Sequence, residues 1–235
     1  MSRRIVITGA GRGIGLGLVE RLAAAGDEVW GTVRNDAAEQ VARAAGAHRV
    51  ERLDLGEQSS IETFGAVMRD AVDSVDVLIN NAGLNSGALG VEDRRAQGPL
   101  LTTGLVVLRQ IEVNAVGPML LTQQLHPLLL AAEHPVVFNV SSQLGSMEVG
   151  GRSTADLGYN ASKSVMNMVT VMSATADPEI CHVAVHPGWV QSDMGGPSAA
   201  VTIDDSVAGL VSVLDGLTLE DSGRFLTWQG DAHPW

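Results

Sequence analysis

The sequence predicts a single doubly wound α/β domain, with a mainly parallel sheet of about seven strands, over residues 1–235. Short β-branched runs alternate with longer segments of helical pattern, and the runs are apolar on both faces. Runs of this kind, separated by helices, are typical of a parallel sheet that is covered on both sides. The chain has no internal repeat, low-complexity tract or Pro/Ser-rich linker, so no domain boundary is indicated.

Seven runs are expected to form strands, from RIVIT to GRFLTW, at residues 4–8, 28–33, 48–54, 75–80, 135–141, 181–186 and 223–228. Helices are expected between them at about 13–25, 36–45, 58–72, 101–131, 158–176 and 204–214. Three irregular stretches, at 84–100, 142–157 and 188–202, follow strand ends. Ligands bind at that edge of a doubly wound sheet, so these stretches are expected to shape a site.

Composition limits the partners of this protein. The formal net charge is −12, so nucleic acid and anionic membranes would be repelled unless the arginines cluster on one face. Cys181 is the only cysteine and stands in the apolar run ICHVAVH, where a small buried thiol is expected. The apolar stretch at 5–8 is too short for a signal peptide, and no window approaches the roughly 18 apolar residues of a membrane span. We therefore expect a reduced, cytoplasmic protein.

A glycine cluster, TGAGRGIG at residues 8–15, follows the first expected strand and opens the first expected helix. Its backbone N–H groups and the positive end of the helix could hold a pyrophosphate. The usual G-x-G-x-x-G spacing is not matched; the pattern is T-G-x-x-x-G-x-G. An isolated cluster of this kind is equally compatible with a tight turn, but the preceding strand and following helix favour nucleotide binding.

The end of the second expected strand favours NADP(H) over NAD(H). In many dinucleotide-binding proteins an acid at this point bonds the ribose 2′-OH, whereas an arginine accommodates a 2′-phosphate. Here Val33 and Arg34 end the strand, and the first carboxylate is Asp36. Arg12, inside the glycine cluster, could grip the same phosphate in a bidentate fork. Each arginine alone is better explained as a solvated surface charge, and it is their joint placement that favours NADP(H).

The segment YNASK holds the only tyrosine and the only lysine of the chain, Tyr159 and Lys163. Positions four apart share one face of a helix, so the ammonium group is expected beside the phenol. An opposite charge favours the tyrosinate and lowers the pKa of the phenol, which would suit it to proton transfer near neutral pH. The alternative is a surface pair with a solvated amine.

Four motifs in order, the glycine cluster, NNAG at 80–83, a serine pair at 141–142 and Y-x-x-x-K at 159–163, resemble the short-chain dehydrogenase/reductase family. The resemblance spans Thr8 to about Met194. Further on, HPGWVQSDMGG and the ending GRFLTWQGDAHPW are similar to the C-factor-like carbonyl reductase branch. The family resemblance implies a Rossmann-type fold, a bound NADP(H) or NAD(H), and hydride transfer between a carbonyl and an alcohol.

The resemblance also implies roles for individual residues. The catalytic residues it implies are Ser142, Tyr159, Lys163 and Asn114. Ser142 is expected to donate a hydrogen bond to the substrate carbonyl, and Asn114 to hold a water in a proton relay. The cofactor is expected to be held by Tyr159, by Lys163 and by residues that follow the ends of several strands. These residues are Gly9, Arg12, Gly13, Ile14, Gly15, Arg34, Asp54, Leu55, Asn80, Ala82, Gly83, Pro187, Gly188, Val190 and Ser192. Asp54 and Leu55 match the adenine contact, and Ser192 stands where many members have Thr. Ser141 is the competitor for the role given to Ser142, and a polar strand end capped by hydroxyls would also explain the pair.

One departure from the family pattern concerns the segment between Ser142 and Tyr159, which is a few residues longer than in many members. Because this segment shapes the pocket, the substrate is not indicated. Candidate pocket residues are Leu84, Leu144, Met147, Val149, Trp189 and Met194. The six histidines show no paired metal-ligand spacing, so no metal is expected.

The sequence therefore predicts an NADP(H)-dependent oxidoreductase that interconverts a carbonyl and an alcohol. The alternatives are an NAD-dependent alcohol dehydrogenase of the same family and a non-catalytic nucleotide-binding sensor or signalling protein. The helices at 101–131 and 158–176 carry more apolar residues than one core-facing stripe needs, and helices at these positions pair subunits in the resembling family. A homodimer or homotetramer is therefore expected.

Overall fold

A computed structural model describes residues 2–91 and 93–235 of the chain. Its seven strands form one sheet in the order β3-β2-β1-β4-β5-β6-β7, and every neighbouring pair is parallel. The strands are β1 Arg4–Thr8, β2 Glu28–Val33, β3 Arg49–Arg52, β4 Val77–Asn80, β5 Val136–Val140, β6 Cys181–His186 and β7 Phe225–Thr227. The predicted doubly wound, mainly parallel sheet of about seven strands is confirmed.

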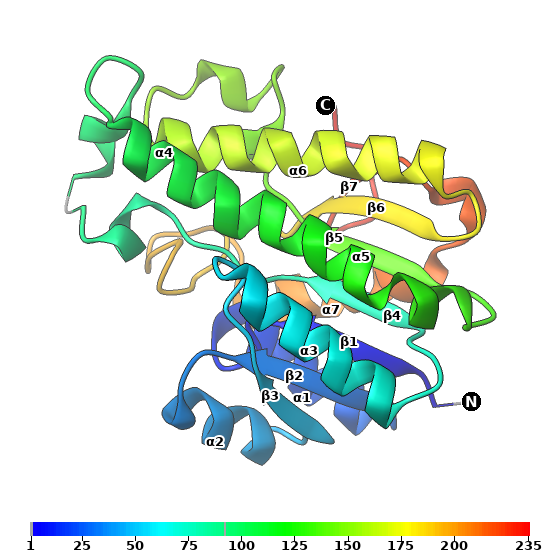
Figure 1. Ribbon diagram of the computed structural model, residues 1–235. Helices are drawn as coiled ribbons and strands as arrows, with labels where there is room; N and C mark the ends of the chain where they lie inside the picture. The colour runs from blue at the N-terminus through cyan, green and yellow to red at the C-terminus, as the bar shows by residue number, and fades with distance from the viewer. Residues whose placement is uncertain (1, 92) are drawn as a thin grey trace.

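Helices cover both faces of this sheet (Figure 1). They are α1 Gly13–Ala24, α2 Asp36–Ala44, α3 Gln58–Ala71, α4 Gly104–Ile111, α5 Gly117–Leu130, α6 Leu157–Ala176 and α7 Ile203–Gly216. The side chains of alternate strand residues divide between two cores. Ile5 and Ile7 of β1 pack with α1, α2 and α7, whereas Val6 packs with α3 and α5. Burial on both faces explains why the strand segments read as continuous apolar runs.

The expected helix at 101–131 is divided into two. α4 ends at Ile111, a π-helical turn follows over Glu112–Val116, and α5 begins at Gly117. Single π-helical turns are often found at functional sites, and this one contains Asn114. The tight approach of the chain at Gly117 to the backbone of Leu55 leaves no room for a side chain there.

One expectation from composition has to be corrected. The helical stretch Gly104–Leu130 is long and apolar enough, by length and composition alone, to cross a membrane. Leu121, Leu125 and Leu129 in the α5 part of this stretch are fully buried against α3 and the sheet, whereas Leu105 and Leu108 in the α4 part are exposed. A helix of a protein core passes the same test as a membrane span.

Candidate active site

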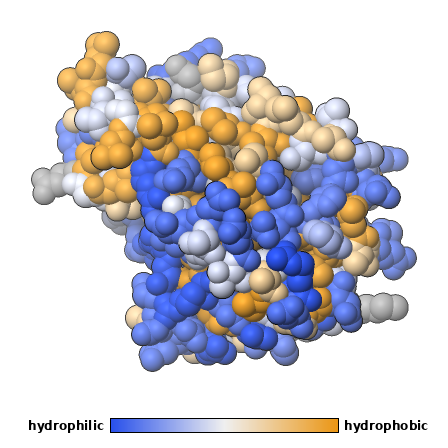
Figure 2. All heavy atoms as spheres, viewed as in Figure 1, coloured by the Kyte–Doolittle hydropathy of each residue, from blue (hydrophilic) through white to orange (hydrophobic). Residues whose placement is uncertain are grey.

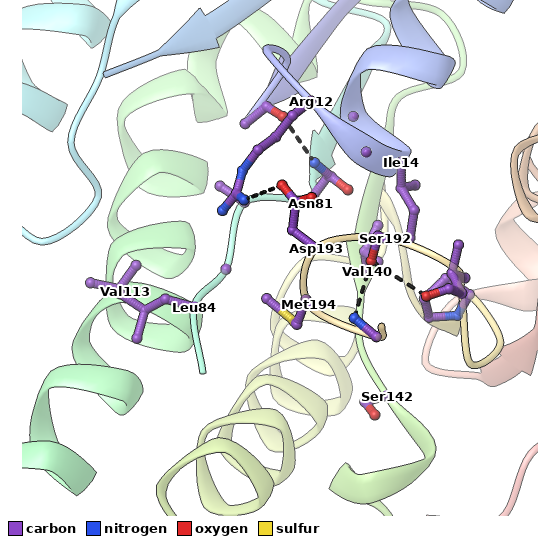
Figure 3. Close-up of a pocket in the computed structure, with 18 of the residues that line it drawn as sticks. Arg12, Ile14, Asn81, Leu84, Val113, Val140, Ser142, Ser192, Asp193 and Met194 are labelled. Carbon is purple, nitrogen blue, oxygen red and sulfur yellow. Dashed lines mark hydrogen bonds and ion pairs between the residues drawn. The ribbon is translucent and has the colours of Figure 1, made fainter. Parts of the chain in front are cut away.

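A cavity of about 400 Å³ lies at the carboxyl ends of the strands, where the order of the sheet reverses between β1 and β4 (Figure 3). Residues that follow β1, β2, β4, β5 and β6 line it, and each of the three irregular stretches contributes to its wall. Of the expected pocket residues, Leu84, Leu144, Trp189 and Met194 line this cavity. Met147 and Val149 do not, and both side chains are exposed.

The glycine loop is fixed to the end of β4. The hydroxyl of Thr8 accepts hydrogen bonds from the N–H groups of Asn81 and Ala82, at 3.0 and 2.9 Å. The side-chain amide of Asn81 donates to the carbonyl of Thr8 at 2.8 Å. Gly13 has φ of 55°, a conformation that favours glycine, and a side chain at Gly15 would collide with the backbone of Gly9. The unusual glycine spacing is therefore required by this loop.

The start of α1 fits a dinucleotide pyrophosphate. Arg12 at the N-cap makes no side-chain hydrogen bond to the helix, which leaves the first backbone N–H groups without a side-chain acceptor, and Gly13, Ile14 and Gly15 line the cavity. Backbone donors at a helix N-terminus are a ready site for phosphate. Ser192 lies next to the loop, with its Cβ 3.8 Å from the position that a Cβ of Gly13 would take.

The end of β2 carries no acid toward the cavity. Thr32, Val33, Arg34 and Asn35 line it there, and the Arg34 side chain is exposed. The nearest following carboxylate, Asp36, does not line the cavity and pairs with Arg52.

The second arginine of the site, Arg12, forms an ion pair with Asp193 at 2.7 Å, which Figure 3 shows across the cavity mouth. Both side chains are exposed, so the pair is weak, at about 0–1 kcal/mol. Asp193 lines the cavity, and sequence reasoning did not predict it as a residue of the site.

The expected adenosine contacts are only partly brought together. Asp54, Leu55, Ala82 and Gly83 line the cavity, but Asn80 does not. Its side chain is buried between β4 and β5, where it donates to Asn139 Oδ1 at 2.8 Å. Asn80 ends β4, so its side chain is held in the sheet, and the next residue, Asn81, reaches the wall instead.

The Lys163 side chain is buried against the end of β5. Its Nζ donates to the carbonyl of Val140 at 2.8 Å and lies 5.8 Å from the centre of the Tyr159 ring. Burial lowers the pKa of Lys163 from 10.5 to about 8, because desolvation penalises the charged form. Lys163 is closely surrounded. A Cβ on Gly145 would collide with the backbone of Lys163, and the Nζ of Lys163 lies next to Gly83.

The two serines after β5 differ in what they bond. The Ser141 hydroxyl donates to Asn167 Oδ1 at 2.6 Å, so its proton is used within the protein. The Ser142 oxygen accepts from the N–H of Leu144 at 3.1 Å, which leaves its own proton available for a ligand. Both residues line the cavity, beside Tyr159, and this difference favours Ser142 as the donor.

Asn114 is fully buried and does not line the cavity. Its side chain accepts from Leu84 N at 2.8 Å and donates to Leu84 O at 2.7 Å and to Ser162 Oγ at 2.9 Å. Its oxygen and Lys163 Nζ both lie near Gly83. Both amide protons are used, so the side chain of Asn114 fixes the loop after β4 to α6.

Asp156 also positions the site, and sequence reasoning missed it. It caps α6 with φ of 54°, and its carboxylate accepts from Ser86 Oγ at 2.8 Å and from Gln110 Nε2 at 3.1 Å. It thereby joins the start of the helix that carries Tyr159 to the loop after β4 and to α4. An Asp three residues before the tyrosine is an N-cap signal that could have found it.

The fold and the cavity define the class of the protein: a dinucleotide-binding α/β oxidoreductase. The family model described as short chain dehydrogenase matches residues 3–202. The chain is 41% identical to C-signal of Myxococcus xanthus over 165 residues, which cover 68% of this chain and 93% of that protein. It is 30% identical to the short-chain dehydrogenase srdF of Neurospora crassa over 98% of this chain and 97% of that protein.

Solved structures agree with these relatives. An NADPH-bound carbonyl reductase from chicken fatty liver superposes with a TM-score of 0.88 at 32% identity, over 100% of this chain and 99% of that one. The carbonyl reductase Sniffer of D. melanogaster gives a TM-score of 0.82 at 26% identity, with both chains fully covered. This chain belongs to the short-chain dehydrogenase/reductase family and resembles its C-factor branch.

Proposed function

We propose that the protein is an NADP(H)-dependent oxidoreductase that interconverts a ketone or aldehyde and an alcohol. The observation that carries this proposal is the convergence of Ser142, Tyr159 and Lys163 on one cavity, which the glycine loop also lines. A hydroxyl donor, a phenol and an ammonium at one place are suited to placing a proton on a developing alkoxide.

NADP(H), when bound against the glycine loop, would supply the hydride for reduction and accept it in oxidation. Ser142 donates a hydrogen bond to the carbonyl oxygen and stabilises negative charge on it. Tyr159 gives its phenolic proton to the same oxygen, and Lys163 stabilises the phenolate that remains. Asn114 holds the loop after β4 against α6, which keeps Lys163 in place.

NADP(H) is the cofactor that the cavity favours. Arg34 and Arg12 lie at the part of the cavity where a 2′-phosphate is expected, and the described residues that line it at the end of β2, Thr32 to Asn35, include no acid. The chicken carbonyl reductase that is similar over the full chain holds NADPH. For phosphate to be gripped by Arg12, this arginine has to leave Asp193.

Replacing Arg34 with Asp is expected to reverse part of this preference. The change puts a carboxylate beside the expected 2′-phosphate, so the ratio of NADPH to NADH affinity should fall by about tenfold or more, which is roughly 1.4 kcal/mol. The dissociation constants of both cofactors, followed by their fluorescence on binding, measure the ratio. Arg21→Asp, which makes the same charge change outside the cavity, should leave it unchanged. Equal affinity of the unmodified protein for both cofactors would contradict the assignment.

Initial rates with NADPH and NADH against a panel of aldehydes and ketones test the proposed reaction itself. Carbonyl-dependent oxidation of NADPH supports it. A faster reaction with NAD⁺ and alcohols would favour the alcohol dehydrogenase. Binding of NADPH without turnover of any carbonyl or alcohol would favour a nucleotide-binding signalling protein.

A homodimer or homotetramer is expected from the surface of α4 and α6. Figure 2 shows hydrophobic side chains gathered over these helices; those exposed include Leu101, Leu105, Leu108, Met168 and Met172. Exposed apolar patches of this kind mark sites of association. Sedimentation at micromolar concentration should give at least twice the monomer mass of 24.5 kDa, and Leu105→Lys combined with Met168→Lys should shift it to the monomer. A wild-type monomer would contradict the expectation.

A further inference from the structure

Two sequence features that the proposed reaction does not use lie against each other. One is the segment that follows Ser142, and the other is the segment GDAHPW at residues 230–235. The N–H groups of Met147 and Glu148 donate to the carbonyl oxygen of Trp235, at 3.1 and 3.4 Å. The hydroxyl of Ser146 donates to the same oxygen at 3.1 Å.

We propose that residues 231–235, the 231–235 clamp, position the loop at residues 142–150, the serine loop, and thereby the hydroxyl of Ser142. The proposal rests on the proposed function, because it assigns the clamp a role in carbonyl binding. In the terms of that reaction the clamp residues are positioning residues, since they act on the substrate through the serine loop.

The serine loop is folded around Ser146, which is 1% exposed. The Ser146 oxygen accepts from Val149 N at 3.1 Å, and its carbonyl accepts from Gly150 N at 2.8 Å. One turn earlier, the carbonyl of Ser142 accepts from Gly145 N at 2.9 Å. The loop is therefore a chain of short turns that begins at Ser142, and a shift at Ser146 is passed to Ser142 through a single turn.

The clamp is itself fixed to the edge of the sheet. The N–H of His233 donates to the carbonyl of Phe225 in β7 at 2.7 Å. The ring of Trp235 stacks on Phe225 with centroids 5.2 Å apart, and the His233 ring lies 4.5 Å from it. Because Phe225 is buried, these ring contacts give the acceptor oxygen of Trp235 a fixed position from which to hold the loop.

The clamp also reaches the cavity wall. The rings of His233 and His186 meet edge to face, with centroids 5.7 Å apart, and His186 lines the cavity. Leu144, which follows Ser142 in the first turn of the serine loop, lines it as well. Loss of the clamp would therefore displace the carbonyl-binding part of the cavity, whereas the glycine loop, which follows β1 and is separated from β7 by three strands, would be unaffected.

Trp235→Ala and Ser146→Ala test the clamp, with Trp235→Phe as the conservative variant that keeps an aromatic stack. Ser222→Ala is the matched control, because the Ser222 hydroxyl also makes two hydrogen bonds to backbone groups, with His182 and Ile180 at the other end of β6. Amide hydrogen exchange is measured on each variant. The Michaelis constant KM, kcat and the NADPH dissociation constant are then measured with the carbonyl found best in the panel.

Both alanine variants should speed hydrogen exchange within residues 147–150 and raise KM for the carbonyl by about three- to tenfold, the range expected for a lost hydrogen bond. The NADPH affinity of both alanine variants should stay within about twofold of the wild-type value. Trp235→Phe should keep KM close to that of the wild type. Ser222→Ala should change neither the hydrogen exchange in the serine loop nor KM. Unchanged exchange in the loop, or an unchanged KM, would overturn the clamp. A wild-type protein that binds NADPH but reduces no carbonyl would overturn the proposed function and the catalytic role of the clamp together, even where exchange in the loop responds.

Discussion

Replacing Tyr159 with Phe is expected to lower kcat for carbonyl reduction by about 10³-fold, within the range for loss of a general acid. The ring that packs beside Lys163 is retained, and the glycine loop is untouched, so NADPH affinity should change by less than about twofold. Single-turnover rates with saturating NADPH measure the first effect, and the fluorescence of bound NADPH measures the second.

Tyr159 is the only tyrosine of the chain, so no other phenol can replace it as proton donor in the variant. Ser141→Ala provides a matched loss of one hydroxyl in the same wall, with a much smaller effect expected, because the Ser141 proton is already given to Asn167. A Tyr159→Phe enzyme that keeps more than about a tenth of the wild-type kcat would show that another group protonates the alkoxide.

The stability of the cofactor-free protein should depend on pH through Lys163. Its pKa falls from 10.5 in the unfolded chain to about 8 in the folded protein. Between these values the unfolded chain binds more protons at this residue, so the free energy of unfolding rises with pH. Below pH 8 burial of the charged amine costs the folded state about 3 kcal/mol, and this cost disappears as the pH approaches 10.5.

A comparison with Lys163→Met isolates this effect, preferably with Tyr159→Phe in both proteins to remove the phenol. Lys163 is the only lysine. Burial raises the pKa of Cys181 from 9.0 to about 12, so the thiol titrates in the unfolded chain within this range and lowers the free energy of unfolding as the pH rises. It does so equally in both proteins, so it cancels in the difference between them. The lysine protein should gain about 3 kcal/mol on the methionine variant between pH 7.5 and 10.5, measured by urea unfolding. A difference between the two proteins that stays constant over these pH values would contradict the buried, desolvated amine.

The sheet was predictable because its strands carry the pattern of two-sided burial. Seven apolar runs separated by helical segments are enough to indicate a parallel sheet, and Cys181, expected to be a buried thiol, is 2% exposed. The division of 101–131 into α4, a π-helical turn and α5 could not be read from the sequence. The apolar pattern continues through the turn, and no glycine or proline marks the turn before Gly117.

The candidate site was predictable where a motif fixes a short spacing, as between Tyr159 and Lys163, and less so where contacts are distant in the chain. Asn80 and Asn81 are adjacent and chemically identical, so only the end of β4 decides which one reaches the cavity. The ion pair of Arg12 with Asp193 joins positions 181 residues apart. No local sequence pattern predicts a contact between residues so far apart in the chain.

The reversal of strand order at β1 and β4 divides the site between two halves of the chain. Arg34 and Asp54 follow strands on one side of that point, whereas Ser142 and the tyrosine–lysine helix follow it on the other. The halves meet along the pairing of Ile5–Ile7 with Val77–Ile79. The proposed determinants of cofactor choice and of proton transfer are thus encoded in separate parts of the gene, so recombination near codon 80 could exchange one set between relatives while the other is inherited intact.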